Sequence, residues 1–151
     1  PPKGLQPFPG FDASRYLGKW YEVARLENRF ERGLEQVTAT YGKRSDGGIS
    51  VLNRGYDPVK KKWNESEGKA YFTGEPTTAA LKVSFFGPFY GGYNVIKLDD
   101  KYQYALVSGP NRDYLWILSR TPTIPDAVKQ DYLNTARELG FRVDQLVWVK
   151  H

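Results

Sequence analysis

Two stretches of the sequence decide the fold: GKWYEVAR at residues 18–25 and YLWILSR at residues 114–120. Each reads as a β-strand. A tryptophan near the start of the first strand and an arginine at the end of the last long strand can meet only if the sheet closes on itself, because the first and last strands are then neighbours. We expect the guanidinium of Arg120 to lie over the indole of Trp20, a cation–π contact worth about 0.5–2 kcal/mol. The two stretches therefore predict a closed barrel.

Between these stretches, short β-prone runs recur every ~8–15 residues, a spacing typical of barrels and sandwiches. We expect strands near residues 20–26, 36–43, 49–56, 63–72, 80–86, 92–98, 102–108 and 114–120. Gly-, Pro- and Asp-containing turns separate them. Beyond Arg120 the period becomes helical, since Pro125 suits a first helical turn and Gly140 a helix end. The apolar helix positions are Val128, Tyr132, Ala136 and Leu139, and residues 146–149 predict one more strand.

We therefore predict an all-β fold, an eight-stranded antiparallel up-and-down β-barrel with a C-terminal α-helix and a ninth strand. The length of 151 residues suits one domain. We assign that domain to residues 15–151, after an N-terminal leader of residues 1–14 that contains four prolines. No stretch approaches the ~18 apolar residues of a membrane-spanning helix.

Longer runs carry a resemblance to a known family. They are GLEQVTATY at 33–41, SEGKAYFTG at 66–74, ALKVSFFGPFYGGYNVI at 80–96 and ALVSGPNRDYLWILSRTP at 105–122. Together with Gly18, Trp20 and Arg120, they make the chain from Leu17 to Lys150 resemble the lipocalins, and specifically the bacterial lipocalins of the outer membrane. One turn departs from the family pattern, because its Thr-Asp-Tyr reads Asp99-Asp100-Lys101 here. The resemblance implies a small barrel that carries an apolar ligand.

Strand alternation, anchored at Trp20 and Arg120, predicts which side chains face the barrel interior. We expect the ligand-binding interior to be lined by Val37, Ala39, Tyr41, Val51, Asn53, Gly55, Ala70, Phe72, Val83, Phe85, Asn94, Ile96, Ala105, Val107, Tyr114, Trp116 and Leu118. Two readings of this lining are open. Aromatic side chains from opposite walls could simply fill a small eight-stranded barrel. The small residues among them favour unfilled volume, and the lipocalin resemblance favours a cavity.

Two interior residues have both a structural and a functional interpretation. Asn53 would be costly inside an apolar barrel without a partner. It either bonds a backbone group or a buried water, or it bonds the ligand, the role that the resemblance implies. Trp116 is either core filling or, by the same resemblance, a wall against which the ligand stacks.

Loops alternate between the two ends of an up-and-down barrel, and Trp20 with Arg120 marks the closed end. Loops 27–35, 57–62, 87–92 and 109–113 should then share the open end. They carry the predicted mouth residues Arg29, Phe30, Arg32, Lys60, Lys61, Lys62, Phe89, Tyr90 and Arg112. The three consecutive lysines form either a solvated turn or, together with the exposed aromatic residues, the entrance for an anionic amphiphile. Gly18, Trp20 and Arg120 are assigned a structural role.

The sequence gives little support for a catalytic site or a metal site. The chain has no cysteine and a single histidine, His151, so Cys–His and Ser–His nucleophiles are excluded. Glu65 and Glu67 form a carboxylate pair more typical of solvated surface than of a glycosidase. Asp99 and Asp100 lack further oxygen ligands for a metal, and the glycines of 87–92 precede no helix that would make a phosphate loop. We expect no enzyme activity, no metal and no cofactor.

The resulting hypothesis is a non-catalytic carrier of a fatty acid or lysophospholipid. The net charge of +5 favours contact with an anionic membrane surface. The resemblance implies a homodimer and a lipid-anchored place at the cell outer membrane facing the periplasm, although the anchoring cysteine is absent from this sequence. A single-stranded nucleic-acid binder and a lipocalin-type enzyme are the alternatives; inward-facing aromatic residues argue against nucleic acid as a partner.

Overall fold

The computed structural model describes residues 1–151, except for the side chain of Phe86. The strands are β1 (Gly18–Leu26), β2 (Glu35–Lys43), β3 (Ile49–Asp57), β4 (Lys62–Phe72), β5 (Ala80–Phe86), β6 (Phe89–Leu98), β7 (Tyr104–Ser108), β8 (Leu115–Ser119) and β9 (Leu146–Trp148). The helices are α1 (Ala13–Tyr16), α2 (Asp126–Glu138) and the 3-10 turn η1 (Val143–Gln145). The nine strands and α2 occur in the order predicted from the sequence, whereas α1 and η1 were not predicted.

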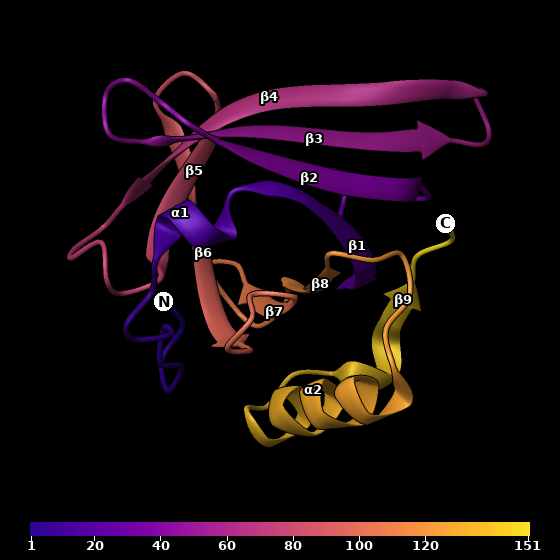
Figure 1. Ribbon diagram of the computed structural model, residues 1–151. Helices are drawn as coiled ribbons and strands as arrows, with labels where there is room; N and C mark the ends of the chain where they lie inside the picture. The colour runs from indigo at the N-terminus through magenta and orange to yellow at the C-terminus, as the bar shows by residue number, and fades with distance from the viewer.

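The sheet is antiparallel and closed. Each strand from β2 to β7 pairs with the next, β8 pairs with β1, and β1 pairs with β2. Figure 1 shows the long strands β2, β3 and β4 reaching far to one side, with α2 below them against the outside of the barrel. The predicted eight-stranded barrel with a C-terminal helix and a ninth strand is confirmed.

Strand β1 is shared among three neighbours. Its first half pairs with β2, and its second half pairs with β8 on one edge and β9 on the other. The register against β8 shifts between Glu22 and Ala24. This irregularity, a β-bulge, breaks the two-residue period. As a result Val23 and Ala24 both pack outside the barrel, whereas Glu22 and Arg25 lie opposite inward-facing residues of β8.

Two apolar clusters stabilise the fold. One fills the inside of the barrel around Trp20, Tyr41 and Val107. The other joins the outer wall to α2, where Tyr132 and Ala136 are buried. The helical stripe predicted from the sequence therefore packs as expected. Gly140 follows the helix with φ of +92°, a left-handed conformation that glycine adopts without strain.

The closed end is tied together by Arg120. Its guanidinium carbon lies 3.8 Å from the centroid of the Trp20 ring, so the predicted cation–π contact is confirmed. The same guanidinium donates hydrogen bonds to the carbonyl oxygens of Arg15, Lys19 and Tyr102. It thereby joins α1, β1 and the turn before β7.

The turn that departs from the family pattern is organised by its first aspartate. Asp99 accepts hydrogen bonds from the backbone N–H groups of Lys101, Gln103 and Tyr104. Asp100 is exposed, and its carbonyl oxygen accepts a hydrogen bond from Arg15. The changed sequence therefore keeps a tight turn.

The leader is ordered by contact with the barrel. The N–H of Phe8 donates to the carbonyl of Val95, and the carbonyl of Phe8 accepts from Ala79. Phe11 is buried in the interior cluster. In Figure 1 the N-terminus and α1 lie on the side away from the far ends of β2–β4, so the leader packs against the closed part of the barrel.

Candidate functional site

Most of the predicted lining faces the barrel interior. Tyr41 pairs with Val51, and Ala39 pairs with Asn53, so these side chains share one face of the sheet. The interior cluster also contains Ala70, Phe72, Val83, Phe85, Ala105, Val107, Trp116 and Leu118. A Cβ on Gly55 would lie 3.0 Å from the side chain of Leu34 and 3.2 Å from that of Val37. Glycine at 55 therefore leaves room for these two side chains.

The inward phase predicted for Asn94 and Ile96 is wrong. Val95 pairs with inward-facing Val107, and Tyr93 pairs with inward-facing Leu81. Asn94 points the other way and donates a hydrogen bond to the carbonyl of Gly109, while Ile96 packs with the helix-side cluster. The register of β6 shifts between Val95 and Lys97, so Leu98 returns to the interior and strict alternation fails along this strand.

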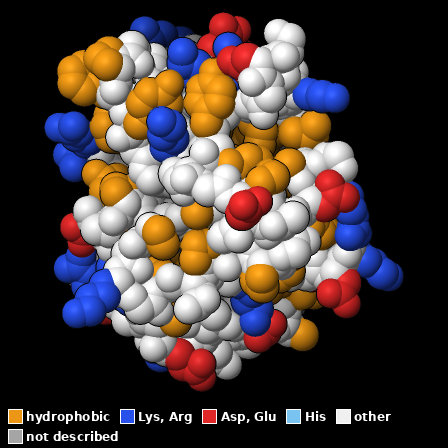
Figure 2. Space-filling model, turned by 90° about the vertical axis from the view of Figure 1, so that its left-hand side faces the viewer, with side chains coloured by type: hydrophobic (Ala, Val, Ile, Leu, Met, Phe, Trp, Pro, Cys, Tyr) orange, Lys and Arg blue, Asp and Glu red, His pale blue; other side chains and the backbone are white. Residues whose placement is uncertain are grey.

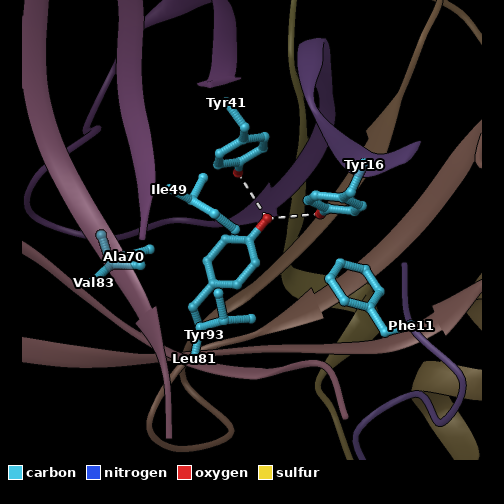
Figure 3. Close-up of a pocket in the computed structure, with 8 residues that line it drawn as sticks. All are labelled: Phe11, Tyr16, Tyr41, Ile49, Ala70, Leu81, Val83 and Tyr93. Carbon is cyan, nitrogen blue, oxygen red and sulfur yellow. Dashed lines mark hydrogen bonds between the residues drawn. The ribbon is translucent and has the colours of Figure 1, made fainter. Parts of the chain in front are cut away.

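The closed half of the barrel is nearly full. The hydroxyl of Tyr93 lies 2.7 Å from those of Tyr16 and Tyr41, and Figure 3 shows the three rings converging beside Phe11. The cavity there measures about 10 Å³ and is lined by Phe11, Tyr16, Tyr41, Ile49, Ala70, Leu81, Val83 and Tyr93. This volume suits one water at most. The space that Ala70 was expected to leave is occupied by rings from the leader and β6.

The tyrosine cluster remains neutral at physiological pH. Burial raises the pKa of Tyr16, Tyr41 and Tyr93 above the ordinary value of a phenol. The Tyr93 hydroxyl bonds those of Tyr16 and Tyr41, and the cluster presents no ionised group to a ligand. The cluster therefore acts as a floor for the barrel, and neither Tyr16 nor Tyr93 was identified from the sequence.

Several side chains that face the interior are only half-buried: Ala39, Asn53, Phe72, Val83, Phe85 and Trp116. Apolar interior surface is thus in contact with solvent, as a binding site requires. A larger hollow of about 490 Å³ lies outside the barrel between α2 and β9, with Leu133, Phe141 and Trp148 in its lining. It is an open surface feature. The barrel interior is therefore the candidate site.

A cluster of charged side chains faces the interior in the other half of the barrel, beyond the tyrosine cluster. Glu22 pairs with inward-facing Leu118, and Arg25 pairs with Trp116. The Nε of Arg25 donates to Glu27 at 2.8 Å, and its Nη2 donates to the carbonyl of Leu34 at 3.1 Å. These contacts hold both ends of loop 27–34 against β1.

Glu31 attaches the middle of the same loop to the barrel wall. Its Oε1 accepts hydrogen bonds from Trp116 Nε1 at 2.8 Å and from Asn28 Nδ2 at 3.0 Å. Asn28 in turn accepts bonds from the backbone N–H groups of Phe30 and Glu31. Loop 27–34 is therefore a structured cover fixed to Trp116.

Burial raises the pKa of Glu22 well above its usual range, and the nearby Glu31 carboxylate raises it further. Arg25 acts in the opposite direction. For Glu27, whose side chain keeps contact with solvent, the hydrogen bond and charge of Arg25 outweigh desolvation and lower the pKa. The cluster thus combines a carboxyl group that favours its protonated form with ionised neighbours.

This charged cluster was not predicted from the sequence. Alternation from Trp20 could have placed Glu22 inside. Arg25 could not be placed in this way, because it lies an odd number of positions after Trp20 and only the bulge turns it inward. The contact of Glu31 with Trp116 joins residues 85 positions apart, so no local pattern predicts it.

Asn53 and Trp116 lie where the sequence predicted. Asn53 faces inward between Ala39 and Ser66, and within the described residues its side chain has no hydrogen-bond partner. The ring of Trp116 stacks on that of Tyr114 with centroids 6.2 Å apart. These three side chains form part of the solvent-accessible wall.

The predicted mouth is not a single ring. Arg29 and Phe30 lie on loop 27–34, with the guanidinium carbon of Arg29 4.9 Å from the Phe30 ring centroid. Lys60, Lys61 and Lys62 lie at the tip of the β3–β4 hairpin, which Figure 1 places far from β5 and β6. Tyr90 lies over Lys82 and near Tyr71, on the outer face, so its predicted mouth position is wrong. Phe89 is exposed beside it at the start of β6.

Neither a metal site nor a membrane-spanning helix is found among the described residues. These residues contain no group of three or more His, Asp or Glu side chains arranged to hold a metal ion. None of the described helices is long and apolar enough to cross a membrane.

Comparison with known proteins agrees with this architecture. Residues 11–151 match the lipocalin-like domain. The chain is 66% identical over 150 residues to the outer membrane lipoprotein Blc of Citrobacter freundii and 65% identical to that of Escherichia coli strain K12; each alignment covers 99% of this chain and 85% of the relative. It is also 36% identical over 155 residues to temperature-induced lipocalin-1 of Arabidopsis thaliana, with 95% of this chain and 81% of the relative covered.

Among solved structures, insecticyanin of the tobacco hornworm Manduca sexta has the same fold, with a TM-score of 0.79 at 20% identity and coverage of 100% of this chain and 86% of that one. The cockroach allergen Per a 4 gives a TM-score of 0.77 at 21% identity, with 99% and 94% covered. A closed eight-stranded barrel, the Trp20–Arg120 contact and these matches lead to one conclusion: the chain belongs to the lipocalin family and is similar to its bacterial outer-membrane lipoproteins.

Proposed function

We propose that this protein is a non-catalytic carrier that binds a fatty acid or lysophospholipid inside its barrel. The observation that carries the proposal is the half-buried apolar lining, in which Trp116 and Phe85 face inward yet keep solvent contact. The tyrosine cluster fills the closed half, so the ligand occupies the other half beneath loop 27–34. Family membership supports this assignment, since lipocalins generally bind and transport small molecules.

The relatives named outer membrane lipoproteins support a place at the bacterial outer membrane. We propose that the protein works on the periplasmic side, where a carrier can exchange lipids with the inner face of that membrane. An acyl chain of ~16 carbons gains about 12 kcal/mol from burial. Association and ordering offset several kcal/mol of this gain, which leaves micromolar to nanomolar affinity.

Tryptophan fluorescence tests the proposal. Titration with palmitate or a palmitoyl lysophospholipid should change the emission, and Trp116→Phe should remove most of the change. Trp63→Phe and Trp148→Phe are matched controls, because both side chains are more than two-fifths exposed and lie outside the lining. Native mass spectrometry of the same samples should show the bound lipid by mass. Absence of both the emission change and the bound mass would exclude the carrier function.

A further inference from the structure

Two charged side chains inside the barrel form a long ion pair whose facing atoms make no hydrogen bond. Glu22 is 4% exposed and Arg25 is 1% exposed. Within the described residues, Glu22 Oε1 and Arg25 Nη1 accept or donate no hydrogen bond. The two atoms lie 3.9 Å apart, beyond hydrogen-bond distance but close enough for one oxygen to contact both.

Both side chains lie on the face of β1 that is turned toward the barrel interior. Glu22 shares the inner face with Leu118, and Arg25 shares it with Trp116. The other donors of Arg25 are already engaged by Glu27 and by the carbonyl of Leu34, which fixes the guanidinium. Native proteins rarely leave buried polar atoms without a hydrogen bond. This donor and this acceptor have no contact with solvent, so a polar group of the ligand is a candidate partner for both.

The charge of the cluster limits the chemistry of its ligand. Glu22, Glu27 and Glu31 surround the one cation, Arg25. An anionic carboxylate or phosphate would meet this excess of carboxyl groups and be repelled. A neutral hydroxyl can accept a hydrogen bond from Arg25 and donate one to a glutamate oxygen. The aromatic face of Trp116 beside it suits the carbon skeleton that carries such a hydroxyl.

We propose that Glu22 and Arg25, backed by Glu31 and Trp116, bind a neutral hydroxyl of the ligand's head, of the kind found on an acylated glycerol. This inference rests on the proposed carrier function and narrows its ligand class. It predicts that a monoacylglycerol binds more tightly than a free fatty acid of the same chain length. The shared glyceryl hydroxyl can come from a neutral acylglycerol or from a lysophospholipid.

The test measures displacement of a fluorescent acyl probe by four ligands with one palmitoyl chain. They are 1-palmitoylglycerol, its analogue with both hydroxyls methylated, palmitate and a 1-palmitoyl lysophospholipid. For the wild-type protein, 1-palmitoylglycerol should bind about tenfold more tightly than the methylated analogue, the ratio expected from one hydrogen bond to a charged group. It should also bind more tightly than palmitate.

Two substitutions test whether Glu22 causes the preference for 1-palmitoylglycerol over its methylated analogue. Glu22→Leu should reduce the tenfold ratio to near one, and Glu22→Gln, which keeps a hydrogen-bonding amide, should restore most of it. Glu65→Gln on the outer face of β4 is a matched control, because its ion pair with Arg54 is exposed, and it should leave the ratio unchanged. If Glu22→Leu does not fold, the methylated analogue with the wild-type protein still tests the hydroxyl.

The outcomes distinguish failure of the hydroxyl site from failure of the proposed carrier function. Equal affinity for 1-palmitoylglycerol and its methylated analogue, or tighter binding of palmitate, would overturn the hydroxyl site and leave the carrier intact. Failure of all four ligands to displace the probe would overturn the carrier as well. If Glu22→Leu weakens the binding of the lysophospholipid as it weakens that of 1-palmitoylglycerol, the site accepts the hydroxyl of both lipids. If the binding of the lysophospholipid is unchanged, the site accepts the neutral acylglycerol alone.

Discussion

Arg120 shows how much one side chain can hold together in this barrel. It covers the Trp20 ring and donates to three backbone carbonyls that come from α1, β1 and the turn before β7. Lysine could supply the charge but not the planar fork that reaches several acceptors at once. The contact lies at the filled end, away from the solvent-accessible lining, so its role is structural.

We expect Arg120→Ala to lower the free energy of unfolding by about 2–4 kcal/mol, from the lost cation–π contact and unpaired carbonyl groups. Lipid affinity of the folded protein should remain near that of the wild type. Urea unfolding and probe displacement measure the two effects. Arg142→Ala, which removes an exposed ion pair with Asp113, should change neither. A large loss of affinity at unchanged stability would contradict the structural assignment.

Glu22 should make stability depend on pH. Because its pKa is raised in the folded protein, the unfolded chain releases this proton first as the pH rises above about 4.5, the ordinary value for glutamate. The unfolded state then binds fewer protons than the folded state, so stability falls with rising pH. Arg25, Glu27, Glu31 and Tyr41 influence the same titration.

Glu22→Gln removes this titration. The variant should gain stability over the wild type progressively from pH 4.5 upward, with no growing difference below that pH. Urea unfolding of both proteins at pH 4, 5, 6, 7 and 8 gives the difference between their free energies of unfolding. The contributions of the other carboxyl groups cancel in this difference to first order. A difference that shrinks as the pH rises would show that Glu22 is held ionised instead.

At the scale of elements, loop 27–34 depends on contacts with the neighbouring strand β1 and the distant strand β8. Glu31 bonds Trp116 of β8, and Leu34 is held by Arg25 of β1. The β1 bulge is what brings Arg25 to the inner face, so a local irregularity in one strand positions the cover of the barrel. The loop has few apolar contacts of its own, since Phe30 is 66% exposed.

We expect Trp116→Phe to release the middle of this loop. Tryptic cleavage after Arg29 and Arg32 should become about tenfold faster under native conditions, because local opening no longer breaks a hydrogen bond to a charged acceptor. Mass spectrometry identifies the cut sites. Tyr114→Phe, which keeps the aromatic ring beside Trp116, is the control and should leave the rate unchanged. Equal cleavage rates for the two variants would show that the bond does not fasten the loop.

At the scale of the whole molecule, charge and apolar surface are spread out. Figure 2 shows both signs of charge over one face, with hydrophobic side chains gathered mainly in its upper half. The three consecutive lysines instead lie at the tip of the β3–β4 hairpin, beside Val59, which is 87% exposed. A basic and apolar tip on a projecting hairpin is suited to contact an anionic membrane surface.

Replacing Lys60, Lys61 and Lys62 by Gln should slow the uptake of lipid from anionic vesicles and flatten its dependence on salt, since each basic residue near such a surface contributes about 1 kcal/mol. Stopped-flow fluorescence with vesicles of anionic and neutral composition measures the rates. A control with Lys3, Lys43 and Lys101 replaced by Gln has the same net charge. Equal slowing in both triple variants would assign the effect to net charge and contradict a role for the tip.

The sequence by itself determined the barrel, its strand order, the α2 stripe and the Trp20–Arg120 contact. These features follow from residue periods and from end positions that only a closed sheet can bring together. It also predicted most of the lining, because alternation survives along β2, β3, β4 and β8. The roles of Asn53 and Trp116 toward a ligand stay predictions, as do the lipid anchor and the homodimer.

Only the tertiary structure decided where alternation stops. A register shift in β6 exchanged Asn94 and Ile96 for Tyr93 and Val95, and the bulge in β1 brought Arg25 inside next to Glu22. Phe11 of the leader and Tyr16 of α1, distant in sequence from most of the strands they contact, filled the closed half. Tyr90 packs with Lys82 and Tyr71 and not with the lysines of the β3–β4 hairpin. An inserted residue or a long-range contact changes packing without changing any local pattern, and for that physical reason the charged cluster could be found only in the folded protein.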